Sequence, residues 1–220
     1  MSVKRRILDL LFPPKCPFCR KLLNNSETGC CVECINALPL TRECDSVKVD
    51  FMTKVVAPLY YEKQVRDSFL RYKFHGVTAY STVYAQFIAD VIARDLVGEY
   101  DFITWVPLSR KRLRKRGYDQ TRLIAEKIAV SLKVPLIPTL EKVRETKVQS
   151  TLTTVEERRG NISGSYTVTV SQQLAGKRIL LVDDILTTGA TLSECARVLL
   201  LGGAESVCGA VFARKRGESK

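Results

Sequence analysis

An apolar run that ends in two adjacent acids places the strongest constraint on the fold of this chain of 220 residues. The run lies in Arg178–Val182, and Asp183 and Asp184 follow it directly. A continuous apolar run before two acids is typical of a strand that is covered on both faces in a parallel sheet. Further strands are predicted at residues 53–61, 102–107, 165–170 and 207–212, with a short strand within 134–143.

Helical patterns occupy much of the chain between these strands. Apolar residues recur with a spacing of four in 79–97, which is the pattern of one helix face. The basic stretch after residue 107 is predicted to be a loop, and residues 144–163 a long mobile loop. The alternation of strands and helices predicts an α/β domain with a mostly parallel sheet and helices on both faces. Helices are predicted at 62–75, 79–97, about 118–133 and 190–201, the last closed by Gly202 and Gly203.

The eight cysteines are concentrated near the N-terminus, with six of them in the first 44 residues. Cys16 and Cys19 form one pair with two residues between them, and Cys31 and Cys34 form another. Such spacing lets four thiolates converge on one ion, which predicts a closed, structural Zn²⁺ site. The cysteine-rich segment has too few large apolar residues for a core of its own. We therefore expect a metal-held module at 1–46, including a short N-terminal helix, and a separate domain at 47–220.

The ligand set has alternatives at this stage. Cys30 adjoins Cys31 and could replace it, although three residues then separate the pair with Cys34. Cys44 could replace any one of the four. A set of free thiols on a flexible arm is the other interpretation of the cluster. The two remaining cysteines lie in apolar stretches and are expected in the core; they are Cys195 and Cys208.

The loop that follows the two acids has the composition of a phosphate site. Threonine hydroxyls and Gly189 precede a predicted helix, whose free N–H groups favour a phosphate. The two carboxylates are suited to accept hydrogen bonds from ribose hydroxyls or to support Mg²⁺. Alternatively, Asp184 caps a helix and the threonines form a turn. The Gly-x4-Gly-Lys-Ser/Thr pattern of a nucleotide loop is absent from this stretch.

Charge and hydropathy limit the partners. The chain has 35 basic and 23 acidic residues, a net charge of +12 and a pI near 9.4, which indicates anionic partners. Residues 110–116 contain six cations in seven positions, which predicts either a surface for single-stranded DNA or a solvated face. The N-terminal run Ile7–Phe12 is too short for a signal peptide, and no window reaches the ~20 apolar residues of a membrane span. We expect a cytoplasmic protein without membrane insertion.

The stretch LLVDDILTTGAT at 180–191 resembles the phosphoribosyl pyrophosphate (PRPP) signature of type I phosphoribosyltransferases. The chain as a whole resembles the ComF family of competence-associated proteins, also described as amidophosphoribosyltransferase-like or GntX-like. The similar segments are LLFPPKCPFC with the following Leu38-Pro39, YKFHG at 72–76, VPLSRKRLRKRGYDQTRLIA at 106–125 and RETKVQSTLTTVEERRGNISGSY at 144–166. The resemblance implies the type I phosphoribosyltransferase fold with an added N-terminal zinc module.

The resemblance also implies roles for residues that match the family's motifs. Asp183 and Asp184 are the expected catalytic acids and hold the ribose 2′- and 3′-hydroxyls of PRPP. The residues expected to bind the 5′-phosphate are Thr187, Thr188, Gly189, Ala190 and Thr191. Those expected at the pyrophosphate loop or as a further substrate contact are Leu108, Ser109, Arg110 and Lys73.

Two further groups come from the same resemblance. The loop expected to close over PRPP carries Thr146, Gln149, Arg158 and Asn161. The basic block comprises Arg112, Arg114, Lys115, Arg116, Gly117 and Gln120. Asp119 stands where the family usually has asparagine, which removes a hydrogen-bond donor and adds negative charge near a phosphate site.

These features predict three alternative functions. The first is a Mg²⁺-dependent phosphoribosyltransferase that displaces pyrophosphate at the anomeric carbon, its acceptor chosen by a hood formed by parts of residues 1–75. The second is a catalytically silent adaptor that senses PRPP or binds single-stranded DNA alongside other DNA-uptake proteins. The third is a zinc-held interaction module. His75, the single histidine, is expected to be a surface or packing residue after a helix.

Overall fold

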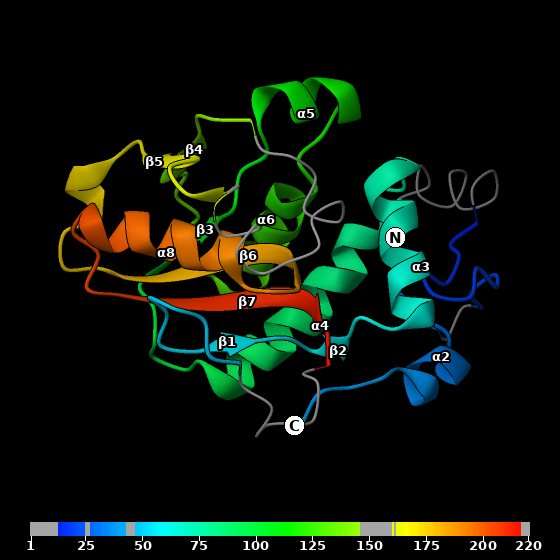
Figure 1. Cartoon of the computed structure of the whole chain (residues 1–220). Coiled ribbons are helices and arrows are strands. Elements are labelled where there is room, and N and C mark those ends of the chain that lie inside the picture. Colours follow the sequence, from blue (N-terminus) through cyan, green and yellow to red (C-terminus); the bar gives the residue numbers. More distant parts are fainter. Residues whose placement is uncertain (1–12, 25–26, 43–46, 146–159, 161, 217–220) are drawn as a thin grey trace.

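A five-stranded, all-parallel sheet forms the centre of the molecule (Figure 1). The computed structural model describes residues 13–24, 27–42, 47–145, 160 and 162–216. The strand order is β1-β7-β6-β3, and β2 also pairs with β7. The strands are β1 (Val55–Val56), β2 (Leu59–Tyr60), β3 (Phe102–Trp105), β6 (Arg178–Leu186) and β7 (Ser206–Arg214).

Helices cover both faces of this sheet. The longer ones are α3 (Lys63–Phe74), α4 (Tyr80–Asp95), α6 (Gln120–Leu132) and α8 (Ala190–Leu201). Ile88 of α4 and Ile124 of α6 lie in one apolar cluster with Leu180 of β6. Leu192 of α8 lies in a second cluster with Leu181 of the same strand. Because neighbouring residues of a strand point to opposite faces, β6 feeds both clusters, and the predicted α/β class is confirmed.

A small antiparallel pair of strands lies beside α8, outside the central sheet (Figure 1). The pair consists of β4 (Leu140–Lys142) and β5 (Tyr166–Val168). Leu140 and Tyr166 pack into the same apolar cluster as α8. The shorter helices are α2 (Val32–Ala37), α5 (Arg110–Arg116) and the 3-10 turn η2 (Ser171–Gln173).

The basic stretch after residue 107 is a helix, so the prediction of a loop is wrong. The hydroxyl of Ser109 accepts the N–H of Arg112 and caps the start of α5, and Gly117 ends it with a φ of +82°. Ser at the N-cap and Gly just after the last turn are strong helix boundaries. Every residue of α5 remains at least partly exposed. The helix therefore lacks the apolar stripe by which a helix is recognised in a sequence.

Two strands also differ from their predicted extents. The strand β6 does not end at Asp183 but continues to Leu186, because β7 pairs with it as far as Arg214. The strand predicted at 53–61 is divided into β1 and β2. Pro58 lies between the two pieces and lacks the N–H that a sheet ladder uses.

Several predictions lie outside the described residues. They concern the N-terminal helix, Cys44, and the loop residues Thr146, Gln149, Arg158 and Asn161. Among the helices that the structure describes, none combines the length and apolar character needed to span a bilayer.

Candidate functional site

The two adjacent acids lie near the carboxyl end of β6. Both are partly buried, and the carboxylate of Asp184 is 16% exposed. Its Oδ2 accepts from Nζ of Lys73 at 3.1 Å and from Nε2 of Gln120 at 3.2 Å. Its Oδ1 accepts the N–H of Ile185 at 2.6 Å, while Oδ1 of Asp183 accepts the N–H of Asp184 at 2.8 Å. Helices α3 and α6 thus both contribute a side chain to one carboxylate.

The environment pushes the pKa values of the two acids in opposite directions. Burial and the neighbouring charge of Asp184 raise the pKa of Asp183 well above its usual range. Burial also opposes ionisation of Asp184, but the charge of Lys73 and the hydrogen bond from Gln120 lower its pKa. The environment therefore favours the charged form of Asp184 and the protonated form of Asp183.

Three cationic side chains lie close enough to the acids to interact with their charge, and a fourth lies beside one of the three. Lys73 lies on α3, Arg112 and Arg116 lie one turn apart on α5, and Lys142 lies on β4. The charges of Lys73 and Lys142 lower the pKa of Asp183, and Arg112 lies close enough to Lys142 to lower its pKa. Four cations against two acids leave a positive site, which suits a ligand with several negative charges.

The loop between β6 and α8 ends in a glycine, so no side chain covers the first N–H groups of α8 at that position. Gly189 directly precedes α8 with a φ of +77°, and a Cβ at this position would lie 3.1 Å from Cγ2 of Val49. Thr187 is exposed, Thr188 is half-buried and Ala190 is buried. The N–H groups at the start of a helix are donors for a phosphate, and the hydroxyls of this loop add further donors.

The residues expected at the pyrophosphate loop have protein partners in this structure. The N–H of Leu108 donates to Oδ2 of Asp119 at 3.1 Å. Ser109 is buried as the cap of α5, and the exposed Arg110 pairs with Glu141 at 2.6 Å. Leu108 and Ser109 thus lie between β3 and α5, Arg110 is the first residue of α5, and the hydrogen bonds of all three are made to other residues of this chain.

The unusual Asp119 has a structural role at the start of α6. Its Oδ1 accepts the N–H groups of Thr121 and Arg122 at 3.1 Å each. Burial raises the pKa of Asp119, while these N–H donors and that of Leu108 counteract the rise. Aspartate and asparagine cap helices equally well, so this position does not need the amide that the family usually carries.

The basic block divides into an inner and an outer part. Arg116 is half-buried and directs its guanidinium to Oε1 of Gln120, and Arg112 is also half-buried. Arg114 and Lys115 are exposed, and Gly117 ends the helix. The charge of Asp184 acts on the pKa of Arg116, and Gln120 donates to that carboxylate, so this part of the block lies at the acids.

Lys142 was not among the predicted site residues. It is buried, and burial with the charge of Arg112 lowers its pKa to about 8. Its Nζ lies 3.3 Å from the hydroxyl oxygen of Tyr166 and 5.0 Å from the centre of that ring. The alternation of β4 is the signal that locates it, because Leu140 and Lys142 share the buried face of the strand. A lysine at an inward position of a strand is a candidate for function.

The N-terminal cysteines form a candidate metal centre. The sulfur atoms of Cys16, Cys19, Cys31 and Cys34 all lie within 4.8 Å of one another. Burial opposes ionisation of Cys16, but backbone hydrogen bonds, led by that of Cys31, lower the pKa of its thiol to about 6. Four thiolates match the tetrahedral donor set of a structural Zn²⁺ site. The predicted quartet is the set that the structure brings together.

The other described cysteines have different environments. The sulfur of Cys30 lies 3.7 Å from that of Cys16 but is not one of the four converging sulfurs. Cys195 and Cys208 are buried in the core, as predicted. His75 is exposed at the end of α3, which agrees with its predicted place after a helix.

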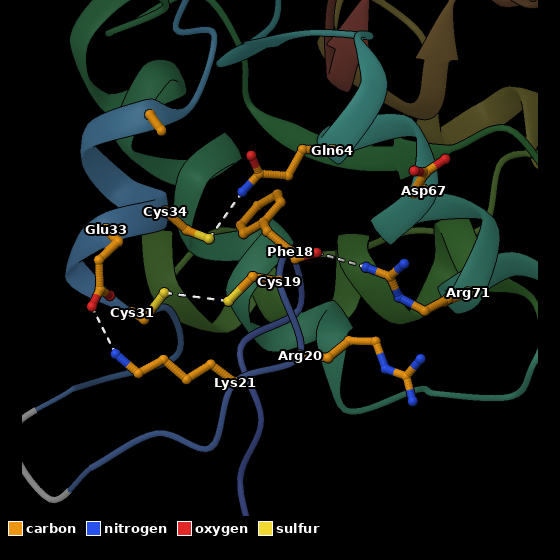
Figure 2. Close-up of a pocket in the computed structure, with 11 residues that line it drawn as sticks. Phe18, Cys19, Arg20, Lys21, Cys31, Glu33, Cys34, Gln64, Asp67 and Arg71 are labelled. Carbon is orange, nitrogen blue, oxygen red and sulfur yellow. Dashed lines mark hydrogen bonds and ion pairs between the residues drawn. The ribbon is translucent and has the colours of Figure 1, made fainter.

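Helix α3 joins the cysteine cluster to the acids. At its start, Nε2 of Gln64 donates to the sulfur of Cys34 at 2.9 Å. Further along, Nη2 of Arg71 donates to the carbonyl oxygens of Pro17 and Phe18 at 2.8 and 2.9 Å (Figure 2). An open groove of about 910 Å³ lies between these contacts. Lys73, two residues after Arg71, reaches Asp184.

Comparisons with known proteins show which proteins this chain is similar to. Residues 121–220 match the phosphoribosyl transferase domain. The chain is 34% identical over 104 residues to competence protein F of Haemophilus influenzae, a match that spans 46% of this chain and 45% of that protein. It is 26% identical over 212 residues to competence protein ComFC of Bacillus subtilis, spanning 92% of this chain and 85% of that protein. The chain thus spans less than half of the first relative.

A solved structure with a partly similar fold is the glutamine PRPP amidotransferase of Bacillus subtilis, complexed with ADP and GMP. The similarity has a TM-score of 0.44 and 19% sequence identity, and it covers 64% of this chain and 30% of that one.

Proposed function

Because residues 121–220 match the phosphoribosyl transferase domain and the chain is similar to competence proteins, we propose that it is a ComF-type protein that binds PRPP and acts as a phosphoribosyltransferase. The observation that carries the proposal is a pair of acids near the end of β6, separated by four residues from the glycine that precedes α8, with Lys73, Arg116 and Lys142 close to them. A pentose with hydroxyls at one side and phosphates at the other matches this distribution of acceptors and donors.

The roles follow from charge and hydrogen-bond capacity. Asp183 and Asp184 accept the ribose hydroxyls, and Thr187, Thr188 and Thr191 with the backbone at Gly189 and Ala190 bind the 5′-phosphate. The cations near the acids bind the pyrophosphate as bidentate or point charges. These cations are Lys73, Arg112, Arg116 and Lys142.

The proposed reaction is a displacement at the anomeric carbon of PRPP. The bond to the pyrophosphate oxygen breaks and pyrophosphate leaves with the electron pair, while a nucleophilic acceptor forms the new bond to carbon. When bound with PRPP, Mg²⁺ supplies charge neutralisation at the departing pyrophosphate. The expected loop with Thr146, Gln149, Arg158 and Asn161 would exclude water from the site.

We propose that residues 1–46 are a zinc-binding module on a phosphoribosyltransferase domain formed by 47–220. The converging thiols of Cys16, Cys19, Cys31 and Cys34 support the module, and Zn²⁺ in this site would be structural because all four positions are taken by cysteine. Reduced thiols are stable in the cytoplasm, which is the compartment we propose. Parts of 1–75 would form the hood that selects the acceptor.

A second candidate function is binding of single-stranded DNA during DNA uptake, in agreement with the competence-protein names of the relatives. The observation that favours this function is a group of exposed cations on α5. Lys111, Arg114 and Lys115 are all exposed on this short helix. Surface cations on one element neutralise backbone phosphates without reading the sequence.

Calorimetric titration of PRPP with MgCl₂ tests the first function. Wild-type protein is expected to bind, and Asp184→Asn is expected to bind roughly 10- to 100-fold more weakly, because it loses hydrogen bonds of a charged group. Asp90→Asn, an exposed carboxylate on α4, is the matched control and should bind like wild type. Absence of wild-type binding, or equal binding by Asp184→Asn, contradicts the assignment.

Affinity for oligothymidylate at several salt concentrations tests the second function. Replacing Arg114 and Lys115 by glutamate should lower the slope of log K against log salt by roughly 1–2, since fewer counterions are released. Replacing the exposed Lys63 and Arg66 of α3 by glutamate changes the net charge equally and should leave the slope closer to wild type. No binding at low salt, or equal effects of both pairs, removes this function for α5.

A further inference from the structure

A buried amide connects the acids with the basic helix α5. Gln120 is the first residue of α6 and is 2% exposed. Its Nε2 donates to Oδ2 of Asp184 at 3.2 Å, and its Oε1 accepts from Nη1 of Arg116. Both ends of the amide are therefore engaged, one by an acceptor and the other by a donor.

The contact with Arg116 determines which way the amide faces. Arginine carries only donors, so the oxygen of Gln120 faces the guanidinium and the amide nitrogen faces Asp184. With the amide turned around, its NH₂ group would meet the guanidinium and its oxygen would meet the carboxylate. Both contacts would then be repulsive, so Arg116 keeps a hydrogen-bond donor directed at Asp184.

The surroundings hold this arrangement from two sides. The hydroxyl of Tyr72 donates to the carbonyl oxygen of Gln120 at 2.7 Å, and the hydroxyl of Tyr118 donates to the carbonyl oxygen of Tyr72. The guanidinium of Arg116 lies over the ring of Phe74, 5.6 Å from its centre. Contacts from the end of α3 and from the turn after α5 thus fix the backbone of Gln120 and the partner of its amide.

The other donor to Asp184 has a different character. Lys73 reaches the same Oδ2 at 3.1 Å, but its side chain is 28% exposed and ends in a flexible ammonium group. An incoming polyanion can attract this ammonium away from Asp184, whereas the buried amide of Gln120 stays in place. Departure of Lys73 frees a lone pair on Oδ2 while Gln120 continues to hold the carboxylate.

We propose that Gln120 is a positioning residue that holds the Asp184 carboxylate ready to accept a ribose hydroxyl, with Arg116 setting the direction of its amide. This inference rests on the proposed PRPP site and deepens it. It assigns the amide a role through Asp184, not a contact with the substrate. It also explains why a glutamine, which can accept and donate at once, stands between a guanidinium and a carboxylate.

A double-mutant cycle on the full chain tests the inference, with PRPP and MgCl₂ as the titrants. Gln120→Leu should weaken binding roughly tenfold in the wild-type background, because a hydrogen bond to a charged group is lost. In the Asp184→Asn background the same change should have a much smaller effect, since the carboxylate that it positions is gone. Thermal unfolding of each variant establishes that it is folded.

A matched control is available on α4, where Nε2 of Gln86 donates to Oδ1 of Asp90 at 2.8 Å on the protein surface. Gln86→Leu should bind PRPP like wild type. Unchanged binding by Gln120→Leu, or an equal loss in both backgrounds, overturns the inference while the PRPP site stands. Absence of binding by the wild type itself removes the proposed function and the inference together, and so is distinguished from failure of the inference alone.

Discussion

At the scale of single residues, Asp183 and Asp184 carry opposite pKa shifts although they are neighbours on one strand. Lys73 and Gln120 hold Asp184 in its charged form, whereas burial and the charge of Asp184 favour the protonated form of Asp183. A carboxyl group that resists ionisation reduces the stability of the folded state at neutral pH. Such a group is typical of a site that serves function at the expense of stability.

Asp183→Asn should therefore stabilise the protein by about 0.5–2 kcal/mol at pH 7. The folded-state pKa of Asp183 is raised, so the folded chain binds more protons than the unfolded chain above the ordinary pKa of about 3.9. The gain in free energy of unfolding that the variant shows over wild type should be absent near that pH, and it should grow as the pH rises toward the raised pKa. Urea unfolding at pH 4 and pH 7 measures it. Asp67→Asn, exposed on α3, is the control, and a variant less stable than wild type at pH 7 contradicts the account.

Gly189→Ala should destabilise the fold by about 1–3 kcal/mol, because the φ of +77° disfavours a side chain and the new Cβ would approach Val49 to 3.1 Å. Gly98→Ala is a matched control with a φ of +74° and no atom within 4 Å of its Cβ. Urea unfolding of both variants separates backbone strain from steric contact. Equal losses of free energy of unfolding in the two variants would show that the contact between the new Cβ and Val49 does not contribute to the destabilisation.

At the scale of elements, local pattern predicts the helices better than the strands. The helix predicted at 190–201 is α8 with the same bounds, because its apolar spacing and closing glycines are both local signals. Helix α5 is missed because its six cations leave no apolar face. The extension of β6 beyond Asp183 depends on pairing with β7, and no local pattern contains that information. Lys142 likewise joins the site only because β4 packs beside α8.

The cysteine module allows the ligand assignment to be tested, because five described cysteines lie close together and only four of their sulfur atoms converge. Cys31→Ser should lose the metal and lower the unfolding temperature, because three thiolates do not complete a tetrahedral site. Cys30→Ser should retain about one zinc ion per chain, as expected for a residue outside the quartet. Metal content by mass spectrometry decides between them. Loss of zinc from Cys30→Ser with retention by Cys31→Ser would reverse the ligand assignment.

At the scale of the whole molecule, the sheet, the basic helix and the cysteine module meet around one helix. Helix α3 contacts the cluster through Gln64 and Arg71 (Figure 2), and it contacts the acids through Lys73. The sequence predicts the acids and the threonine loop because they form one contiguous motif, and it predicts the quartet because both cysteine pairs have the same short spacing. Arg112, Arg116 and Gln120 are expected from the family resemblance, but the contacts of Gln120 with Arg116 and Asp184 depend on how distant segments pack, which periodicity does not reveal.

A crystal structure of the protein soaked with PRPP and MgCl₂ would show directly whether the acids and the start of α8 bind PRPP. We expect ribose hydroxyls within hydrogen-bond distance of Asp183 and Asp184, and the 5′-phosphate at the start of α8. We also expect Lys73 to have moved from Asp184 toward the pyrophosphate. PRPP bound elsewhere, with the Lys73–Asp184 pair intact and the start of α8 free of phosphate, would contradict the proposed site.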